Sequence, residues 1–334
     1  MKILIASPID MDAVKELAKN HDVKDVTTAT REEINSQMPD CEVLVFRSGI
    51  DISAELMERA PHLKLLVRAG SGIDNIDMIY VRERGLELVR IPEPGAQAVA
   101  EMAFAFMLTL SRNLFKADHS MRQGKWTKYE HEGYLLKNKT LGIVGVGNIG
   151  TRVAEMGLVW GMKVIGCIEH LTAERKSEFA QKNISLMDFD DVVSQADYLS
   201  IHVPLKDSTR NLIGAEEFAK MKYGSYLINL ARGGIVDEMA LREGLVNGGR
   251  IRAAALDVHK NEGAGKLSPL VNLPNVILTP HVGAMAVDAQ REIGRRAIDI
   301  INDFEKSQRG IQPAGRRVGT GPLNVHMIQE VDND

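Results

Sequence analysis

Three things are scarce in this sequence of 334 residues: cysteine, an excess of either charge, and long hydrophobic stretches. The two cysteines, Cys41 and Cys167, are far apart and lack a CxxC spacing, which argues against a disulfide framework and against a structural zinc site. A reducing cytoplasm is therefore the expected location. The formal net charge of -4 at pH 7 leaves no basic surplus, so we expect no nucleic-acid partner.

The longest hydrophobic stretch, "MAFAFMLTL" at 102–110, is about half of the roughly 20 residues that span a bilayer, so we expect a buried helix and no membrane partner. The opening "MKILIASPID" predicts a strand and lacks the features of a signal peptide. With 44% apolar and 26% charged residues, the composition is typical of a soluble globular protein. A chain of this length favours two domains, because one hydrophobic core rarely grows so large.

Short β-branched stretches alternate with helical patterns along most of the chain. They read KILIAS, EVLVFRS, LKLLVRAG, LELVRIP, TLGIVGVG, MKVIGCIE, YLSIHVP, SYLINLA, IRAAALDV and NVILTP. Such alternation indicates βαβ units whose parallel sheets are covered by helices on both faces. About ten strands are too many for one sheet of about five or six. The fold class is therefore α/β, with two doubly wound parallel sheets of the Rossmann-like or flavodoxin-like kind, the first ending near Pro94 and the second beginning at Thr140.

Two helices and a tail complete the prediction. Residues 96–118 predict one long helix, apolar on most faces over its first half and suited to burial between domains or subunits. A second helix follows His281, with a stripe formed by Ala289, Ile293, Ala297 and Ile301. This helix needs a sheet to cover and could return to the first domain. The tail from Ser307 onward is Gly-rich and polar, without convincing periodicity.

The stretch "LGIVGVGNIGTRVAEMG" places Gly145, Gly147 and Gly150 between a strand and a helix, at the spacing of a dinucleotide-binding turn. The glycines permit a tight turn, close approach to a pyrophosphate and close packing of helix on strand. Glu169 ends the next strand, where it would bind the ribose hydroxyls and repel a 2′-phosphate. NAD is therefore favoured over NADP. Arg175 and Lys176 follow closely enough to keep a phosphate partner open, although such residues are more often a solvated helix face.

Three later strand ends each deliver charged residues beside small ones. Arg232 precedes two glycines, Asp257 and then Glu262 follow the next strand, and His281 lies in "TPHVGA". Each has a plain structural explanation taken singly: a surface charge, loop solvation, or a core histidine. Ligands bind at the carboxyl ends of parallel strands, so the joint occurrence of these residues favours a single site. A metal site is disfavoured, because no HExxH or paired histidine spacing occurs.

The motifs "GVGNIG", "HVPLKDSTRNLIG", "LINLARGGIVDE", "AALDVHKNE" and "TPHVGA", in this order and spacing, resemble the D-isomer-specific 2-hydroxyacid dehydrogenases. The similarity runs from "RSGIDIS" to "AIDIINDF", nearly the whole chain. It implies that a NAD-binding Rossmann domain, residues 100–284, is inserted into a substrate domain formed by residues 1–99 and 285–334. A homodimer through the region around residues 96–135 is also implied.

The resemblance assigns roles residue by residue. Arg232 matches the substrate-binding arginine, Glu262 the carboxylate and His281 the acid/base of the family. The implied cofactor contacts, besides the glycine turn and Glu169, are Asn148, Ile149, Val203, Pro204, Leu230, Ala231, Asp257, Gly283 and Ala284. "VRAGSGIDNID" resembles the loop whose amides hold the substrate carboxylate, which implicates Gly70, Ser71 and Gly72. "RAG" and "FRS" most resemble phosphoglycerate dehydrogenases, in which Arg47 and Arg68 would face a phosphate or other distal anion.

The sequence departs from the family pattern at three places. Ile168 occupies the position of the ribose-binding aspartate, with Glu169 one residue later. Glu262 is followed by Gly263 where the family has proline, which loosens the loop, and Gln97 replaces a common asparagine. No regulatory domain of the kind fused to some phosphoglycerate dehydrogenases is expected after residue 306.

The predicted activity is NAD-dependent interconversion of a small anionic D-2-hydroxyacid, such as 3-phosphoglycerate or glycerate, and its 2-oxo acid. Arg232 would bind the carboxylate and polarise the carbonyl, while His281 exchanges the proton on the C2 oxygen and Glu262 supports the imidazolium. Two alternatives stay open: a NAD-sensing interaction module resembling the family's corepressors, and a phosphite- or formate-type dehydrogenase.

Overall fold

The structure is a computed structural model that describes residues 1–246 and 249–311. The chain divides into two compact units. Among the described residues, unit 1 contains Met1–Ala96 and 284–311, and unit 2 contains Gln97–Gly283. Residues 284–311 therefore belong to the same unit as the N-terminal segment. Most of the polar tail predicted from Ser307 lies outside the described residues.

Unit 1 is built on a parallel sheet whose five described strands run in the order β2-β1-β3-β4-β5. The strands are β1 (Lys2–Ile5), β2 (Asp22–Asp25), β3 (Val43–Phe46), β4 (Leu65–Arg68) and β5 (Glu87–Arg90). This is a flavodoxin-like order, in which the chain reverses direction across the sheet between β1 and β3. The register pairs Phe46 with Arg68 and Arg68 with Arg90, so two arginines end neighbouring strands.

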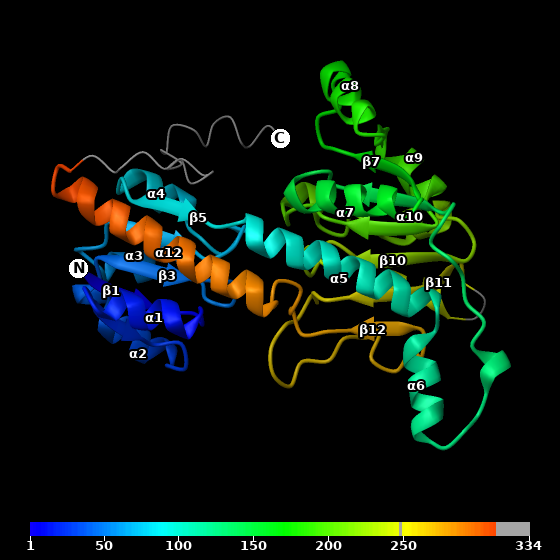
Figure 1. The fold of residues 1–334 in the computed structure, drawn as a ribbon, viewed down its shortest axis with the longest axis horizontal. Helices are drawn as coiled ribbons and strands as arrows, with labels where there is room; N and C mark the ends of the chain where they lie inside the picture. The colour runs from blue at the N-terminus through cyan, green and yellow to red at the C-terminus, as the bar shows by residue number, and fades with distance from the viewer. Residues whose placement is uncertain (247–248, 312–334) are drawn as a thin grey trace. The chain divides into compact units, whose positions relative to one another are not determined.

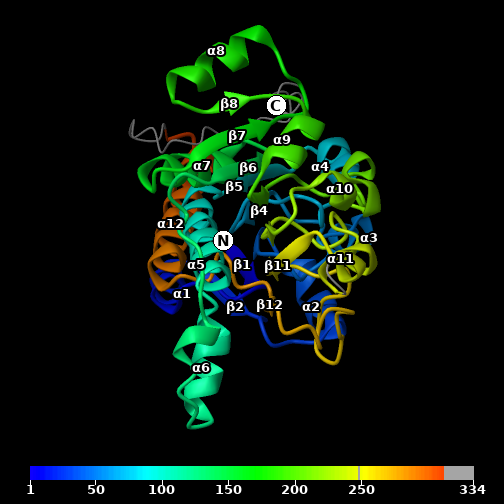
Figure 2. The same ribbon diagram turned by 90° about the vertical axis from the view of Figure 1, so that its right-hand side faces the viewer.

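Helices cover both faces of this sheet (Figures 1 and 2). Helices α1 (Met11–Ala18) and α12 (Val287–Gln308) pack against each other on one face. The predicted stripe of α12 is confirmed, because Ala289, Ile293, Ala297 and Ile301 are all buried. The last three join a core with β1, β3 and β4, so this helix does return to the first sheet. The other face carries α2 (Arg31–Gln37), α3 (Ala54–Glu58) and α4 (Met78–Glu83), and a short 3-10 turn, η1 (Met38–Asp40), follows α2.

Unit 2 has a parallel sheet whose seven described strands run in the order β12-β11-β10-β9-β6-β7-β8. They are β6 (Thr140–Val144), β7 (Lys163–Cys167), β8 (Ser185–Leu186), β9 (Tyr198–Ile201), β10 (Ser225–Asn229), β11 (Ile251–Leu256) and β12 (Val276–Leu278). The order is Rossmann-like, and the chain switches sides between β6 and β9. Strand β6 and the central β9 and β10 are almost completely buried, as expected of a sheet covered on both faces.

The helices of unit 2 also lie on both sheet faces (Figure 2). Helices α5 (Glu93–Ser111) and α7 (Asn148–Val159) lie on one face, whereas α9 (Phe189–Gln195), α10 (Ala215–Lys220) and α11 (Glu238–Leu245) lie on the other. Helix α8 (Ala173–Gln181) packs beside β8, and the 3-10 turns are η2 (Lys128–Glu130) and η3 (Asp207–Thr209).

The prediction of one helix over residues 96–118 is wrong. The structure has α5 followed by α6 (Leu114–Arg122), and the two helices meet at an angle of 62°. The break lies at Asn113, which adopts a left-handed conformation with φ of 52° and donates from Nδ2 to the carbonyl of Glu132 at 2.8 Å. Asparagine tolerates this conformation better than other non-glycine residues, and no hydrophobic pattern records it. Helix α6 projects away from the sheet of its unit (Figures 1 and 2).

Two strands were not predicted, β2 and β8. Both lie at sheet edges, and β2 has the sequence DVKD with no buried residue. Short polar edge strands lack the apolar signal that identifies the buried ones. No single described helix is long and apolar enough to cross a membrane, although α5 and α6 taken together pass that test of length and composition.

Candidate active site

The glycine turn lies between β6 and α7, at the switch point of the unit 2 sheet. Gly145 has a φ of 93°, and a side chain there would collide with the His202 carbonyl at 2.8 Å. A side chain at Gly150 would meet the Gly145 carbonyl at 2.1 Å, so this glycine lets α7 pack against the turn. Gly147, in contrast, has open space around it. Gly145 and Gly150 are therefore required by close neighbouring backbone, whereas Gly147 faces the open side of the turn.

These features fit a dinucleotide. Helix α7 begins at Asn148, so the amides of Asn148 and Ile149 belong to the first helical turn, where backbone donors lack helical partners. A helix N-terminus of this kind stabilises a phosphate. Val203 and Pro204 follow β9, the strand beside β6, and Leu230 and Ala231 follow β10. All the predicted cofactor residues before Ala284 thus lie in unit 2, while Ala284 belongs to unit 1.

Glu169 lies two residues after β7 and is exposed. Its Oε2 atom is 3.4 Å from Nζ of Lys206, a residue in the loop after β9. The sequence reasoning missed Lys206, because only the fold brings the ends of β7 and β9 together. A cation beside Glu169 weakens the repulsion that this carboxylate exerts on a 2′-phosphate.

Arg232 lies in a turn that β10 delivers and that Asn229 holds. The Asn229 side chain is 1% exposed, accepts from the amide of Ala231 at 3.0 Å, and donates to the carbonyl of Arg232 at 3.1 Å. Gly233 is needed next, because a side chain there would lie 1.9 Å from the His259 carbonyl. The Arg232 turn therefore fits closely against the loop that follows β11. Asn229, visible in the motif "INLARG", was not predicted as a site residue.

Asp257 connects the ends of β11 and β12. Its Oδ1 accepts from the Thr279 hydroxyl at 2.6 Å and from the Val282 amide at 2.8 Å, and its Oδ2 accepts from the Gly283 amide at 2.7 Å. These three bonds hold the chain after β12 against the end of β11. Asp257 thus builds the His281 loop, and its predicted contact with the cofactor stays a prediction.

His281 and Glu262 meet in this loop region. Nδ1 of His281 lies 3.0 Å from Oε2 of Glu262, and the His281 amide donates to the Asp257 carbonyl at 2.8 Å. The backbone of His281 is left-handed, with φ of 55°, a conformation that costs energy in a residue with a side chain. With Nδ1 engaged, the Nε2 atom is the one available for proton transfer.

Contacts with His281 and His259 keep Glu262 ionised near neutrality. Burial alone would raise the pKa of Glu262, but the hydrogen bond and charge of His281, together with the His259 amide, hold the pKa below its ordinary value. The His259 amide donates to Oε1 of Glu262 at 3.2 Å. The Nε2 atom of the His259 ring lies 2.9 Å from the Thr279 carbonyl oxygen. His259 therefore links the two loops. The sequence showed this histidine, but nothing in its spacing indicated the role.

The predicted carboxylate loop follows β4 in unit 1 and is held by two arginines. Arg68 donates from Nε to the Gly72 carbonyl at 2.7 Å, and Arg90 donates from Nη1 to the Ser71 carbonyl at 3.2 Å. In a trans peptide the N–H points opposite to the C=O, so the amides of Gly72 and Ile73 point away from these guanidinium groups. Such a pair of amides can bind an anion. The Gly70 amide is engaged within the loop, donating to the Arg68 carbonyl at 2.8 Å.

Arg68 and Arg47 have different environments in unit 1. Arg68 is only 4% exposed and lies beneath the loop. Its position therefore favours holding the loop over binding a distal anion. Arg47 donates from Nη1 to Oε1 of Gln290 at 2.8 Å, and burial lowers the pKa of Arg47. Arg90, which was not predicted, is recognisable afterwards as the strand-end partner of Arg68.

The predicted residues thus fall into two groups. Arg232, Glu262 and His281 follow three neighbouring strands of the unit 2 sheet, β10, β11 and β12. Arg47, Arg68 and the Gly70–Gly72 loop belong to unit 1. Within the described ranges, no group of three or more histidine, cysteine or carboxylate side chains could hold a metal ion.

Residues 104–283 match the family model described as the D-isomer specific 2-hydroxyacid dehydrogenase, NAD binding domain. The chain is 39% identical over 294 residues to a D-3-phosphoglycerate dehydrogenase of Methanocaldococcus jannaschii, with 88% of this chain and 55% of that protein covered. It is 37% identical over 304 residues to a hydroxypyruvate reductase of Thermotoga maritima, with 90% and 97% covered. The chain therefore spans about half the length of the first relative and nearly all of the second.

Solved structures agree with these sequence matches. The D-lactate dehydrogenase of Aquifex aeolicus, determined with NAD and lactic acid, superposes with a TM-score of 0.81 at 27% identity, covering 95% of this chain and 100% of that one. The match includes both units. The chain belongs to the D-isomer specific 2-hydroxyacid dehydrogenase family.

Proposed function

We propose that this protein is a NAD-dependent oxidoreductase that interconverts a D-2-hydroxyacid and its 2-oxo acid. The observation that carries the proposal is the pairing of His281 with Glu262 at 3.0 Å, beside the Arg232 turn and in the same unit as the glycine turn. A nucleotide-binding module alone would not need an acid/base pair at these strand ends. Family membership and the hydroxypyruvate reductase relative support the same activity.

The roles follow from the chemistry of the side chains. Arg232 presents a planar fork of donors that can bind the substrate carboxylate and polarise the adjacent carbonyl. His281 gives a proton to the C2 oxygen in reduction and takes one in oxidation, and Glu262 stabilises the imidazolium that donates it. NAD, when bound, supplies or accepts the hydride. The protein contributes position and charge.

The substrate is proposed to be small and anionic. In unit 1, the amides of Gly72 and Ile73 point away from the arginines that hold their carbonyls, which suits a carboxylate at the Gly70–Gly72 loop. Arg47 is the better placed of the two predicted arginines for a distal anion, because Arg68 is buried beneath the loop. We infer that 3-phosphoglycerate, glycerate or a similar acid is the substrate, and that the corresponding 2-oxo acid is the product of its oxidation.

The activity can be tested by following NADH absorbance with hydroxypyruvate, glyoxylate or phosphohydroxypyruvate. We expect turnover with at least one of them and its loss in His281→Ala. Failure of every 2-oxo acid, with NADH still bound, would favour the sensing module. Turnover of phosphite or formate instead of a 2-oxo acid would favour the phosphite- or formate-type dehydrogenase.

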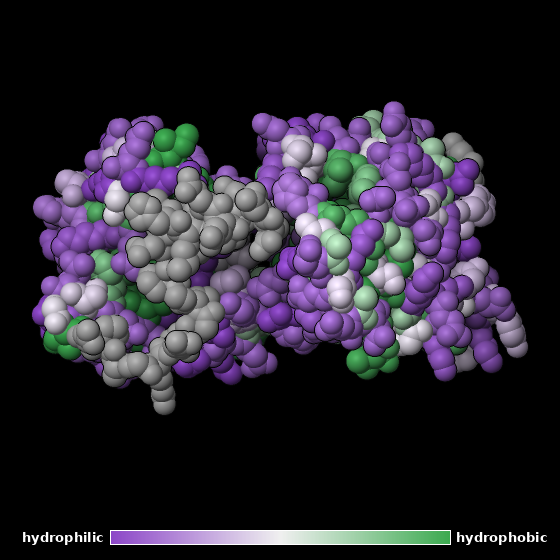
Figure 3. Space-filling model, turned by 90° about the horizontal axis from the view of Figure 1, so that it is seen from above, coloured by the Kyte–Doolittle hydropathy of each residue, from purple (hydrophilic) through white to green (hydrophobic). Residues whose placement is uncertain are grey.

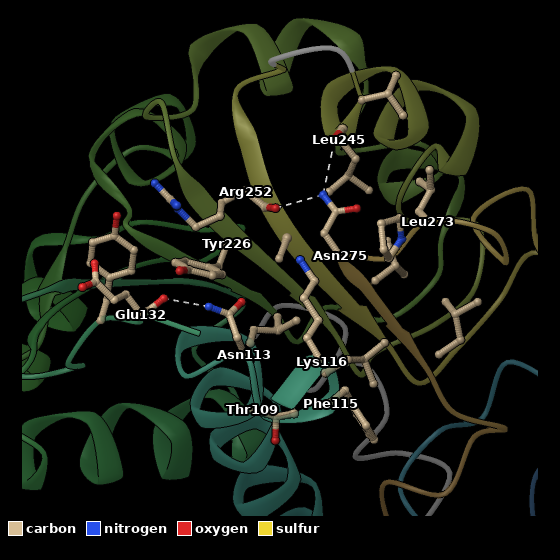
Figure 4. Close-up of a pocket in the computed structure, with 18 of the residues that line it drawn as sticks. Thr109, Asn113, Phe115, Lys116, Glu132, Tyr226, Leu245, Arg252, Leu273 and Asn275 are labelled. Carbon is tan, nitrogen blue, oxygen red and sulfur yellow. Dashed lines mark hydrogen bonds between the residues drawn. The ribbon is translucent and has the colours of Figure 1, made fainter. Parts of the chain in front are cut away.

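We also propose that a second copy of this chain covers a groove in unit 2. The groove has a volume of about 890 Å³ and lies between the α5–α6 corner, the 130–134 segment and strands β10 to β12. Figure 4 shows Asn113, Phe115 and Lys116 on one side and Tyr226 and Arg252 on the other. Such a groove beside a projecting helix suits an interface rather than free surface.

The residues 114–130 supply a matching apolar segment. Phe115 is 61% exposed, Trp126 80% and Tyr129 83%. Figure 3 shows another face of unit 2, away from the end where α6 projects in Figure 1; hydrophobic side chains gather in its middle with hydrophilic ones around them. Light scattering after gel filtration should give the mass of a dimer for the parent and of a monomer for a Phe115→Ser, Trp126→Ser double variant. A parent that stays monomeric at all concentrations would refute the interface.

A cytoplasmic location is proposed from the thiols. Burial raises the pKa of Cys41 to about 12 and that of Cys167 to about 11, so both are unreactive and neither needs a disulfide partner. This suits a reducing compartment.

A further inference from the structure

The first turn of α11 contains a buried carboxylate to which no role has been assigned. Glu238 is 6% exposed, and it follows Arg232 by six residues in the motif "ARGGIVDE". Burying a carboxylate is costly unless hydrogen bonds compensate for the lost water. The partners of Glu238 therefore indicate what this residue does.

The two oxygens of Glu238 bind two points of the same loop. Oε1 accepts from the backbone amide of Lys260 at 2.7 Å, and Oε2 accepts from the Ser268 hydroxyl at 2.7 Å. The Ser268 hydroxyl oxygen also accepts from the Leu270 amide at 3.3 Å. Lys260 and Ser268 stand on either side of residues 261–267, the segment that includes Glu262. One buried carboxylate thus fastens both stems of the loop that carries Glu262.

This loop needs an external anchor. Every residue of 261–267 is exposed, and Gly263 and Gly265 have positive φ values with open space around them. Glycine loses more conformational freedom on ordering than other residues. Glu262 has to be held at 3.0 Å from His281 by a segment with little packing of its own. Because Glu238 holds the two stems, only the exposed residues 261–267 remain to be ordered by other contacts.

The anchor itself is rigid. Asp237 caps α11 by accepting from the amides of Met239 at 2.9 Å and Ala240 at 3.1 Å, and the Asp237 amide donates to the Ile213 carbonyl at 3.0 Å. The chain that leaves the Arg232 turn therefore enters a fixed helix, and Glu238 projects from its first turn. The same short segment links the Arg232 turn to the Glu262 loop.

We propose that Glu238 is a positioning residue that keeps Glu262 in contact with His281. The inference rests on the proposed function, because the contact matters for catalysis only if His281 is the acid/base. We call the two hydrogen bonds that Glu238 accepts, from Lys260 and Ser268, the clamp. Loss of the clamp should let the loop move and weaken the contact by which Glu262 stabilises the His281 imidazolium. Glu238 would then affect proton transfer without touching substrate or cofactor.

The variants separate a clamp from a merely structural residue. Glu238→Ala removes both bonds and Ser268→Ala removes one. Glu238→Gln retains both, because the amide oxygen accepts from Lys260 while the amide nitrogen donates to the Ser268 hydroxyl, which can accept as well as donate. Glu243→Ala removes an exposed carboxylate from the same helix and is the matched control for charge.

We expect Glu238→Ala to lower kcat for reduction by about tenfold to a hundredfold, in the range expected for a misplaced catalytic group. The alkaline limb of its pH profile should move to lower pH, as in Glu262→Gln, while NADH affinity is unchanged. Glu238→Gln should restore most of the rate, and Ser268→Ala should lie between. In a Glu262→Gln background, Glu238→Ala should have little further effect.

Two results would overturn the proposal: a rate loss with an unmoved pH profile, or effects of Glu238→Ala and Glu262→Gln that simply multiply. If Glu238→Ala does not fold, Ser268→Ala decides by the same criteria. If the parent turns over no 2-oxo acid, the proposed function fails, and the clamp is judged separately by NMR. The His281 ring signal should then titrate at lower pH in Glu238→Ala than in the parent, and coincident titrations would reject the clamp.

Discussion

The Nδ1 atom of His281 lies 3.0 Å from Oε2 of Glu262, and the two residues come from loops that follow neighbouring strands, β12 and β11. Contact with His281 and the His259 amide outweighs the effect of burial and lowers the pKa of Glu262, so the carboxylate is ionised across the neutral range. The coupling is reciprocal, and a charged Glu262 therefore favours the imidazolium form of its partner.

Glu262→Gln should move both pH profiles in one direction. Reduction needs the imidazolium, which is less stabilised once the Glu262 carboxylate is gone, so the alkaline limb of the reduction profile should shift to lower pH. Oxidation needs the neutral ring, so its acid limb also shifts down. The rate should fall chiefly in reduction near neutrality. Profiles of kcat/KM in both directions test this, and unmoved limbs would show that Glu262 does not serve His281.

His281→Ala should abolish catalysis in both directions. A positioned acid/base contributes about two to four orders of magnitude in rate. The ring is only partly buried, with 31% of its side chain exposed, so its removal should leave folding and NADH binding nearly intact. Stopped-flow fluorescence would report NADH binding independently of turnover. An active variant, or one that loses cofactor binding and stability together, would identify a structural histidine.

The sequence predicted the buried strands and the charged strand ends, since apolar stretches and small-residue turns are local signals. It missed β2 and β8, because polar edge strands carry no such signal, and it missed the break at Asn113, because φ is not visible in hydrophobic periodicity. His259, Glu238 and Lys206 were also missed. Each contacts a residue at least 20 positions away, Thr279, Lys260 and Glu169 respectively, so its role depends on which loops the fold brings together.

Replacing Glu169 by Ser should lower the NAD/NADP ratio of kcat/KM, because the carboxylate that repels a 2′-phosphate is lost. Lys206, 3.4 Å away, makes this discrimination weaker than a lone carboxylate would give. Lys206→Thr should therefore raise the ratio. Both side chains are about half exposed, which favours modest changes of about tenfold or less. Kinetics with both cofactors decide, and equal ratios in all three proteins would exclude Glu169 from cofactor choice.

Arg68→Ala should raise KM for glyoxylate and for a phosphorylated 2-oxo acid alike. Its Nε atom holds the Gly72 carbonyl at 2.7 Å, and the loss of a charge-assisted hydrogen bond costs about tenfold in binding. Arg47→Ala should raise KM mainly for the phosphorylated acid. Arg68→Lys keeps the charge but not the planar donor, and should resemble Arg68→Ala. A selective loss of the phosphorylated acid in Arg68→Ala would instead restore the distal-anion role first expected from the sequence.

Acid should destabilise unit 2 through His202, the residue that follows β9 beside the glycine turn. Burial lowers the pKa of His202 from 6.5 to about 3, its Nε2 lies 2.8 Å from the Ser200 hydroxyl, and Nδ1 is sealed from solvent without a hydrogen-bond partner among the described residues. The unfolded chain binds a proton near pH 6.5, whereas the folded protein stays neutral there to about pH 3. Stability is therefore complete above pH 6.5 and falls as the pH drops through this window.

The size of this effect is bounded, and a substitution isolates it. Between pH 7 and 5 the loss is at most about 2 kcal/mol, and less to the extent that water reaches the ring. His202→Gln can keep the hydrogen bond to Ser200 without titrating. The free energy of unfolding of this variant should therefore fall less between pH 7 and 5 than that of the parent. Other titrating groups affect both proteins equally. Urea unfolding at pH 7 and pH 5 gives the two differences directly. Parallel losses would mean that His202 is solvated and already free to take a proton in the folded state.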